Sequence, residues 1–212
     1  MANPTITISS TTTGVSNDST TNDTSIELTF TSSESTTNFV AGDITVSGGS
    51  ISNFEAASGM MGPSTTVYTA TLTPSGSGQR IQATTVDVAQ GVFTDAAGNG
   101  NTAATQFRWT FDNIPPTMTI TSTTSGVSNG STTNDASIEL TFTSSESTTN
   151  FVAGDITVSG GTLSNFGAAS GMGGPSTTVY TATLTPSGSG QRTQATTVDV
   201  AQGVFTDAAG NG

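Results

Sequence analysis

Residues 25–34 read SIELTFTSSE, and the same ten letters return at residues 137–146. In both stretches Ile, Leu and Phe stand at every second position, with Glu and Thr between them. Side chains on a β-strand point to opposite faces in turn, so this alternation predicts a strand with one apolar face and one polar face. The Thr residues, which are branched at Cβ, favour strands further. The stretch therefore predicts a β fold that occurs twice in the chain.

The repetition extends well beyond these ten residues. Residues 4–100 align with residues 116–212 at an offset of 112 positions, and only ten of the 97 aligned pairs differ. A period of about 110 residues is too long for a solenoid, whose repeats have roughly 20–50 residues, and suits one independently folding domain per copy. We therefore predict two domains, residues 1–114 and residues 115–212.

Six further strands are predicted in the first copy, each bounded by Gly, Asn, Asp or Pro. They cover residues 5–9, 44–47, 50–54 and 67–73, the segment from Val86 to Phe93, and residues 102–111. In the last of these strands, Phe107, Trp109 and Phe111 share one face. Seven short strands in about 110 residues are typical of a two-sheet antiparallel sandwich of immunoglobulin type. The predicted fold is all-β, with two immunoglobulin-like antiparallel β-sandwiches in tandem.

The two copies differ in their last strand. The second copy runs to Gly212, the equivalent of Gly100, so residues 101–115 have no counterpart in it. We expect the second sandwich to lack its last strand and to leave a sheet edge open. Two interpretations remain: the sequence is cut from a longer repeat array, or the open edge accepts a strand donated by another chain.

Composition excludes several kinds of chemistry. The 212 residues include 46 Thr and 29 Ser but no His or Cys, which excludes a Ser-His-Asp triad, a thiol nucleophile, a disulfide and a zinc site with nitrogen or sulfur ligands. Fifteen acidic residues against three Arg and no Lys give a net charge of −12, which opposes binding to nucleic acid or to an anionic membrane surface. No segment approaches the roughly 20 apolar residues of a membrane helix, so no membrane insertion is expected.

Oxygen ligands for a hard cation remain, and the predicted strand order brings them together. In an immunoglobulin-type sandwich, the loops after the second, fourth and sixth strands lie at the end where the chain enters. Converging carboxylates repel one another unless a cation lies between them, and Ca²⁺ takes about six to eight oxygen ligands. The sequence therefore predicts a calcium site at the entry to the second domain. Its candidate ligands are Asp112 and Asn113 from the linker, with Glu146, Asp155, Asp207 and Asn211 from the loops.

The first copy has an equivalent but smaller set of candidate calcium ligands. No linker acid precedes this copy, so we expect its site to be weaker. For each residue in either set the alternative is a role in a tight turn, because Asp and Asn side chains bind nearby backbone groups. The equivalent residues are Glu34, Asp43, Asp95 and Asn99.

No catalytic site is predicted. Glu27 and Glu139 alternate with apolar residues and are expected on the exposed face of their strands. A glycosidase needs two carboxylates across a cleft, which a small sandwich without insertions does not offer. A carbohydrate-binding module is an alternative, but it needs an exposed aromatic platform. Aromatic residues make up only 6% of the chain, and most fall at inward positions.

Several segments together resemble the bacterial Ig-like repeats of large secreted adhesins and biofilm surface proteins. They are PTITI at 4–8, SIELTFTSSE, GDITVSGG at 42–49, VYTATLTP at 67–74, VFTDAAGNG at 92–100 and FDNIPPT at 111–117. The resemblance covers essentially the whole chain. It implies a spacer or stalk at the bacterial cell surface, often with calcium stiffening the joints.

We therefore expect a non-enzymatic, extracellular spacer segment of a bacterial adhesin or surface filament. Its expected partners are neighbouring Ig-like repeats or other copies of the chain. The alternative is a filament subunit that polymerises when a donated β-strand enters the open edge of the second domain.

Overall fold

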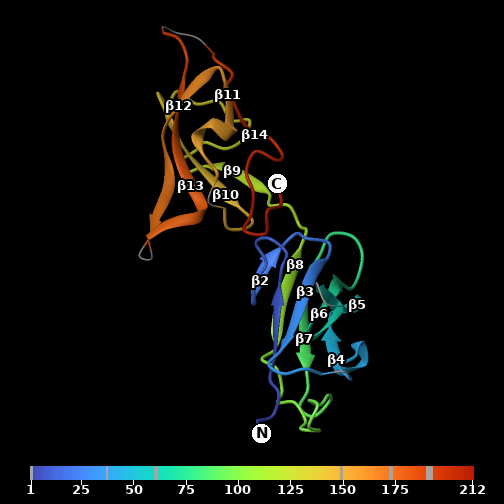
Figure 1. The fold of residues 1–212 in the computed structure, drawn as a ribbon. Helices are drawn as coiled ribbons and strands as arrows, with labels where there is room; N and C mark the ends of the chain where they lie inside the picture. The colour runs from blue at the N-terminus through green and yellow to red at the C-terminus, as the bar shows by residue number, and fades with distance from the viewer. Residues whose placement is uncertain (1, 37, 60–61, 149, 172–173, 190–192) are drawn as a thin grey trace. The chain divides into compact units, whose positions relative to one another are not determined.

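The computed structural model describes residues 2–36, 38–59, 62–148, 150–171, 174–189 and 193–212. The chain divides into two compact units, Met1–Ile114 (unit 1) and Pro115–Gly212 (unit 2). Strands, turns and two single-turn 3₁₀ segments, Ala41–Asp43 and Ala153–Asp155, make up both units (Figure 1). Within the described ranges there is no α-helix.

Unit 1 is a sandwich of two four-stranded sheets. One sheet has the order β1-β3-β6-β5, and the other has the order β2-β8-β7-β4. All neighbouring strands are antiparallel except β2 and β8, which are parallel. This is the strand order of an immunoglobulin-type sandwich, as the sequence predicts. The strands are β1 (Ile6–Ser10), β2 (Ser19–Thr21), β3 (Ile26–Ser32), β4 (Ile44–Ser47), β5 (Gly49–Gly59), β6 (Gly62–Pro74), β7 (Ile81–Val88) and β8 (Phe107–Asp112).

Unit 2 repeats the first sheet completely and the second sheet in part. Its larger sheet has the order β12-β13-β10-β9, and its smaller sheet consists of β11 and β14 alone. Among the residues described in unit 2, none forms a strand at the places of β2 and β8. The predicted all-β fold, two antiparallel β-sandwiches in tandem, is confirmed. The strands are β9 (Met118–Ser122), β10 (Ile138–Ser144), β11 (Ile156–Ser159), β12 (Gly161–Gly171), β13 (Gly174–Pro186) and β14 (Thr197–Val200).

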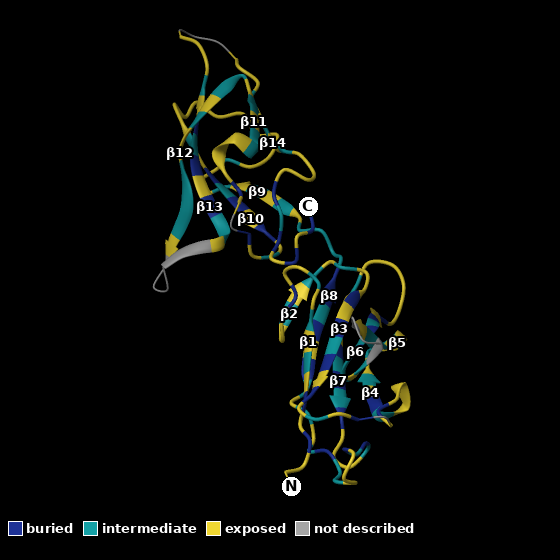
Figure 2. Cartoon of the chain, viewed as in Figure 1, coloured by how far each residue is buried: buried dark blue, intermediate teal, exposed yellow. Residues whose placement is uncertain are grey.

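The core of unit 1 is formed by strands on which buried apolar side chains alternate with exposed polar ones. On β3, Ile26, Leu28 and Phe30 are each at most 1% exposed, whereas Glu27 between them faces solvent. The opposite sheet presents the apolar face of β8, and Figure 2 shows both strands marked by buried residues. Burying a side chain of this size stabilises the fold by about 1.5–3 kcal/mol relative to leaving it exposed. The buried residues of β8 on this face are Phe107, Trp109 and Phe111.

Some strand bounds differ from those that the sequence predicts. β5 and β6 have 11 and 13 residues and are longer than predicted, because they continue to pair as far as Gly59 and Gly62. β7 ends at Val88 and does not reach Phe93, and β8 begins at Phe107 instead of residue 102. The three-residue strand β2 was not predicted, because Ser19–Thr21 contains no apolar residue to alternate.

Candidate functional site

The loops predicted to meet at one end of each sandwich are in contact. In unit 1 the Asn38 side chain, from the loop after β3, bonds to Thr94 in the loop after β7. Its Nδ2 donates to Thr94 Oγ1 at 3.3 Å, and its Oδ1 accepts from Thr94 N at 3.1 Å. Thr36 N also donates to Thr65 O of β6 at 2.8 Å. The equivalent residues of unit 2 make the same contacts, so the strand order places these loops together in both copies.

Glu146 and Asp207 are brought together within unit 2. A carboxylate oxygen of Glu146 lies within 4.8 Å of a carboxylate oxygen of Asp207. Asp207 is buried and Glu146 is half-buried. Asn211 donates to both oxygens of Asp207, from its backbone N–H to Oδ1 at 2.9 Å and from its Nδ2 to Oδ2 at 3.0 Å. Two partly desolvated carboxylates at this separation repel one another, and a cation between them would remove that repulsion.

Asp155 and Asp43 cap turns. Asp155 Oδ2 accepts a hydrogen bond from Val152 N at 2.8 Å and closes the 3₁₀ turn before β11. Asp43 Oδ2 accepts from Val40 N at 2.9 Å and closes the equivalent turn before β4. Over the described part of the chain, neither residue belongs to a group of three carboxylates whose oxygens lie within 4.8 Å of one another. In both units this carboxylate therefore supports the loop from within.

Asp95 organises its own loop in unit 1. Its Oδ1 accepts hydrogen bonds from Ala97 N and Asn99 N, both at 2.8 Å, and its Oδ2 accepts from Asn99 Nδ2 at 2.7 Å. These bonds, above all the one from the Asn99 side chain, hold the pKa of Asp95 below its ordinary value. Glu34 is half-buried in the loop after β3, where its N–H donates to Ser32 Oγ at 3.4 Å. The three hydrogen bonds that Asp95 accepts are those of a residue that stabilises a turn.

The two linker candidates have bonds inside unit 1. Asp112 Oδ1 accepts a hydrogen bond from Ile114 N at 3.0 Å. Asn113 is held by the loop before β7: its Oδ1 accepts from Arg80 N at 2.7 Å, and its Nδ2 donates to Gly78 O at 3.2 Å. The Asn113 side-chain oxygen therefore already has a backbone donor. Sequence reasoning could not anticipate this bond, because Arg80 and Asn113 are 33 residues apart.

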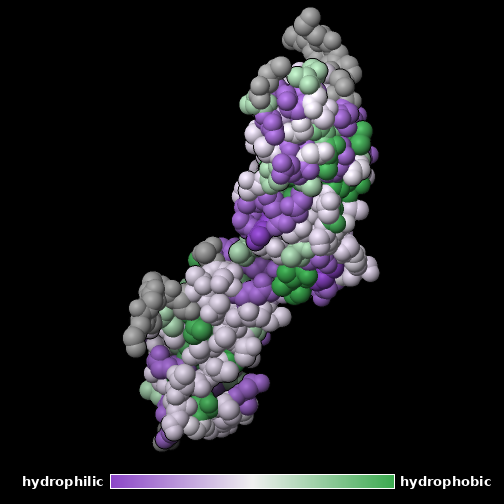
Figure 3. Space-filling view, turned by 90° about the horizontal axis from the view of Figure 1, so that it is seen from below, coloured by the Kyte–Doolittle hydropathy of each residue, from purple (hydrophilic) through white to green (hydrophobic). Residues whose placement is uncertain are grey.

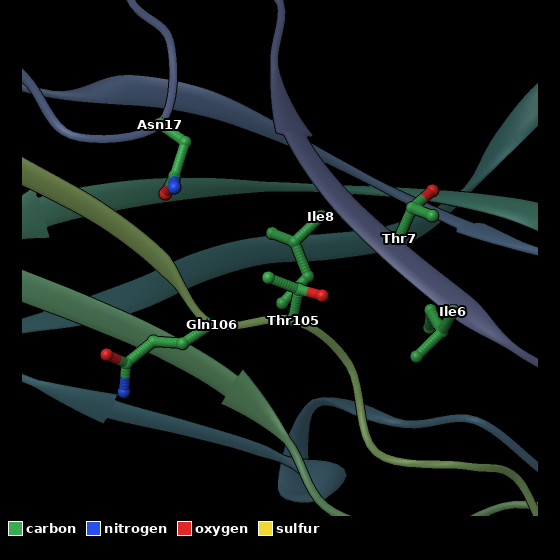
Figure 4. A pocket seen from close by; sticks show the side chains of 6 residues that line it. All are labelled: Ile6, Thr7, Ile8, Asn17, Thr105 and Gln106. Atoms are coloured by element: carbon green, nitrogen blue, oxygen red, sulfur yellow. The ribbon is translucent and has the colours of Figure 1, made fainter.

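A shallow groove of 230 Å³ runs beside β1 in unit 1. Figure 4 shows β1 on one side of it and the segment that leads into β8 on the other. The two side-chain amides of the groove are engaged, since Asn17 Oδ1 accepts from Arg108 N at 2.7 Å and Gln106 Nε2 donates to Asp87 Oδ2 at 2.8 Å. None of its lining residues is charged, so the groove offers no acid or base for catalysis. The lining residues are Ile6, Thr7, Ile8, Asn17, Thr105 and Gln106.

The surface offers little to a ligand that needs aromatic contacts. Hydrophobic residues form small, separate patches on the face that Figure 3 shows. The large hydrophobic side chains exposed within the described ranges are Val40, Ile81, Val152 and Val204, and none is aromatic. Glu27 is exposed, as predicted, and its Oε1 accepts a hydrogen bond from Thr71 Oγ1 at 2.8 Å. No helix in the described part of the chain has the length and apolar character needed to cross a membrane.

Comparison with known protein families matches both units. The model of the bacterial Ig-like domain family matches residues 1–110 and again residues 112–212. The chain therefore belongs to the bacterial Ig-like domain family, and the resemblance seen in the sequence is confirmed. Among curated proteins, none matches the sequence.

Solved structures similar to this chain include three from the S-layer protein SbsC. The N-terminal part of this bacterial protein has 14% identity and a TM-score of 0.30, covering 68% of this chain and 41% of that one. Domains 4–9 have 16% identity and a TM-score of 0.22, with 94% and 30% covered. Domains 5–6 have 18% identity and a TM-score of 0.23, with 96% and 95% covered. The chain thus spans less than half of the first two structures, and likeness at these values says nothing of function.

Proposed function

We propose that the chain is a structural spacer in a bacterial surface protein, with no enzymatic activity. The observation that carries the proposal is that each unit has a hydrophobic core of its own. The core of unit 1 includes Phe30, Phe39 and Trp109, and the core of unit 2 includes Phe142 and Phe151. A domain that buries its own core keeps its shape without help from a neighbour. Such domains in one chain span distance and bear load.

Family membership supports a location outside the cell, and the charge and the linker of the chain suit a spacer. Bacterial Ig-like domains match both halves of the chain. The net charge of −12, with no Lys, makes neighbouring copies repel one another and keeps the surface soluble. Between the units, Pro115 and Pro116 each fix φ near −65° and restrict the residue before them, so the linker resists bending.

We further propose that Ca²⁺ stiffens the joint between the domains. The close approach of Glu146 and Asp207 supplies two carboxylates, and hard oxygen ligands suit Ca²⁺. Thr117 N donates to Ser145 Oγ at 2.9 Å, which ties the start of unit 2 to the residue before Glu146. Asp112 is five residues before Thr117, and five residues span at most about 18 Å, so chain length keeps a third carboxylate within reach. Asn211 and backbone oxygens would complete the ligand set.

Independent cores can be tested with a matched pair of substitutions. Leu140→Ala removes a buried side chain from unit 2 and should cost that unit about 2–5 kcal/mol. Trp109 is the single Trp of the chain and lies in the core of unit 1. Its fluorescence transition in urea should not move in Leu140→Ala but should move to lower urea in Leu28→Ala, the equivalent change in unit 1. A Trp109 transition that moves equally in both variants would contradict the spacer proposal.

The calcium proposal is tested separately by thermal unfolding with Ca²⁺ and with a chelator. Ca²⁺ should raise the midpoint for the native chain, because a ligand that binds only the folded state stabilises it. The Glu146→Gln, Asp207→Asn double variant should lose this shift. Glu139→Gln, on the exposed face of β10, should keep it. Equal midpoints and equal X-ray scattering profiles with and without chelator would remove calcium from the joint and leave the spacer proposal standing.

The second candidate function is that of a filament subunit assembled by strand donation. It is favoured by one observation, that β14 has β11 on one side and no strand on the other within the described residues. Size-exclusion chromatography at increasing concentration separates the two functions. A spacer elutes as a monomer throughout, whereas a polymerising subunit forms larger species as concentration rises.

A further inference from the structure

The chain leaves unit 1 through a residue that is hydrogen-bonded to another loop. Asn113, the first residue after β8, lies beside Arg80, the last residue of the loop between β6 and β7. Asn113 N donates to Arg80 O at 3.2 Å, and Asn113 Oδ1 accepts from Arg80 N at 2.7 Å. Asn113 Nδ2 also donates to Gly78 O at 3.2 Å. We call these three hydrogen bonds the exit clasp.

The exit clasp continues the pairing of β7 and β8 by one position. The register of these strands ends with Ile81 opposite Asp112, so Arg80 and Asn113 are the next pair. In a continued antiparallel pair, Arg80 N would donate to the carbonyl of Asn113. Here the Asn113 side chain supplies the acceptor, which leaves the backbone after Asn113 free to turn away from the sheet. An Asn at this position therefore ends the strand and still holds it to its neighbour.

The loop that carries Arg80 is ordered by the Arg80 side chain. Its Nε donates to Ser75 O at 2.9 Å, and its Nη1 donates to Gly78 O at 3.1 Å. Its Cζ lies 4.6 Å from the centroid of the Phe111 ring, where a cation is attracted to the face of an aromatic ring. Ser75 N and Oγ donate to Gly48 O at 2.9 and 3.0 Å. The loop thus offers Asn113 a partner that is itself fixed to unit 1.

Only a short segment separates the exit clasp from the first hydrogen-bonded residue of unit 2. Thr117 N donates to Ser145 Oγ at 2.9 Å, and Ser145 N donates to Thr117 O at 2.9 Å. Residues 114–116, between Asn113 and Thr117, read Ile-Pro-Pro. Each Pro fixes its own φ near −65°, and a residue before Pro is kept in extended conformations. Few backbone dihedrals of the segment are therefore free to rotate.

We propose that the exit clasp holds the start of this segment and thereby restricts the joint between the units without a metal. Relative motion is the default for two domains in one chain, so a restricted joint needs a specific cause. Asn113 is a positioning residue: its release would add two freely rotating dihedrals for each residue that leaves the clasp. The proposal rests on the proposed spacer function, because a spacer keeps its length only if its joints resist bending.

The test is ¹⁵N NMR relaxation of the full chain in the presence of a chelator, so that no cation contributes to the joint. Two units that are held together share one rotational diffusion tensor, whereas two loosely joined units have separate and shorter correlation times. We expect shared tumbling in the native chain and its loss in Asn113→Ala. Hydrogen exchange of the Arg80 amide should also become faster in this variant, because the variant removes its acceptor.

Asn38→Ala is the matched control. The side-chain amide of Asn38 also joins two loops of unit 1, since its Oδ1 accepts from Thr94 N at 3.1 Å and its Nδ2 donates to Thr94 Oγ1 at 3.3 Å. Thr94 follows the end of β7, whereas Arg80 precedes its start, so these bonds lie at the other end of the strand. Asn38→Ala should therefore leave the shared tumbling of the units unchanged.

Three results would overturn the proposal. Separate correlation times in the native chain with chelator would show that the exit clasp leaves the joint free. Shared tumbling that survives in Asn113→Ala would limit the clasp to the stability of unit 1. Equal loss of shared tumbling in Asn38→Ala would assign the effect to general loosening of unit 1. Failure of the spacer proposal would appear instead in the urea transitions of Leu28→Ala and Leu140→Ala, so the two failures are distinguishable.

Discussion

Asn101 and Phe93 form a double hydrogen bond outside any strand of unit 1. The Asn101 backbone N–H donates to Phe93 O at 3.0 Å, and the Asn101 side-chain Oδ1 accepts from Phe93 N at 3.1 Å. The same side chain donates from Nδ2 to Ala89 O at 2.7 Å and to Thr102 O at 2.8 Å. Asn101 is 0% exposed. One buried amide therefore holds the whole loop between β7 and the segment that leads into β8.

Replacing this amide should destabilise unit 1 strongly. Asn101→Ala removes the partners of several backbone groups, and each buried group left unpaired is costly, so we expect a loss of about 2–4 kcal/mol. Urea unfolding followed by Trp109 fluorescence measures the loss. Asn22→Ala, at an exposed position of the same unit, should stay within about 0.5 kcal/mol of the native chain. Equal effects of the two variants would show that the loop does not depend on Asn101.

The two tyrosines should ionise only at a higher pH than a free Tyr does. Burial raises the pKa of both Tyr68 and Tyr180 above the ordinary value of 10.0, and each hydroxyl donates to a backbone carbonyl at 2.8 Å. Because the folded-state pKa is the higher one, the stabilisation is complete below the unfolded-state pKa and is lost as pH rises through the folded-state pKa. Tyrosinate absorbance should therefore stay low at about pH 10, where a free Tyr is half ionised. The chain has no other Tyr to obscure the signal. Half-maximal ionisation at that pH in the folded chain would contradict this expectation.

Most of the fold can be predicted from the sequence because alternation is a direct consequence of strand geometry. Two strands that show it clearly are β4, which has its predicted bounds of 44–47, and β3, which lies inside the stretch 25–34 that predicts it. The missed features lack that signal. Ser19–Thr21 forms a strand only because it pairs with β8, and β7 stops at Val88 because the loop that follows is held by a side chain 13 residues further on. Long-range hydrogen bonds of this kind leave no local pattern.

The candidate site shows a different limit of sequence reasoning. Strand order alone correctly placed the loops that meet, as the contact between Asn38 and Thr94 shows. It could not say which carboxylates face outward and which bind nearby N–H groups. Asp43 and Asp95 each have such donors within four residues, and a cap and a metal ligand use the same oxygen atoms. Only the conformation of each loop separates the two roles.

Asp95 predicts an acid-dependent stability of unit 1. Hydrogen bonds from Asn99 and neighbouring backbone groups lower the pKa of Asp95 in the folded state. Its contribution is therefore present above the unfolded-state pKa, which is 3.8, and is lost as pH falls through the lower folded-state pKa. The difference in unfolding free energy between the native chain and Asp95→Ala should shrink as pH falls below that value. Urea unfolding followed by Trp109 fluorescence over a series of pH values measures it, and a difference independent of pH would contradict the assignment.

Substitutions at two glycines of unit 1 allow the cost of backbone strain and the cost of a steric clash to be measured separately. Gly48, between β4 and β5, has a φ of +72°, and a Cβ there would lie 2.0 Å from Ala83 O of β7. Gly14 has a similar φ of +81°, but a Cβ there would have no atom within 4 Å. Gly14→Ala should therefore cost only the left-handed backbone term of about 1–2 kcal/mol.

Gly48→Ala should cost more, because Ala83 is paired with Thr110 of β8 and its backbone oxygen cannot move freely. Overpacking of this kind adds about 1–3 kcal/mol, so we expect a total loss of about 2–5 kcal/mol. Both variants lie in unit 1, and Trp109 fluorescence in urea reports both on the same scale. The comparison isolates the clash, since the backbone term is shared. Equal losses would mean that β4 and β7 shift apart at little cost, and that the turn at Gly48 does not fix their separation.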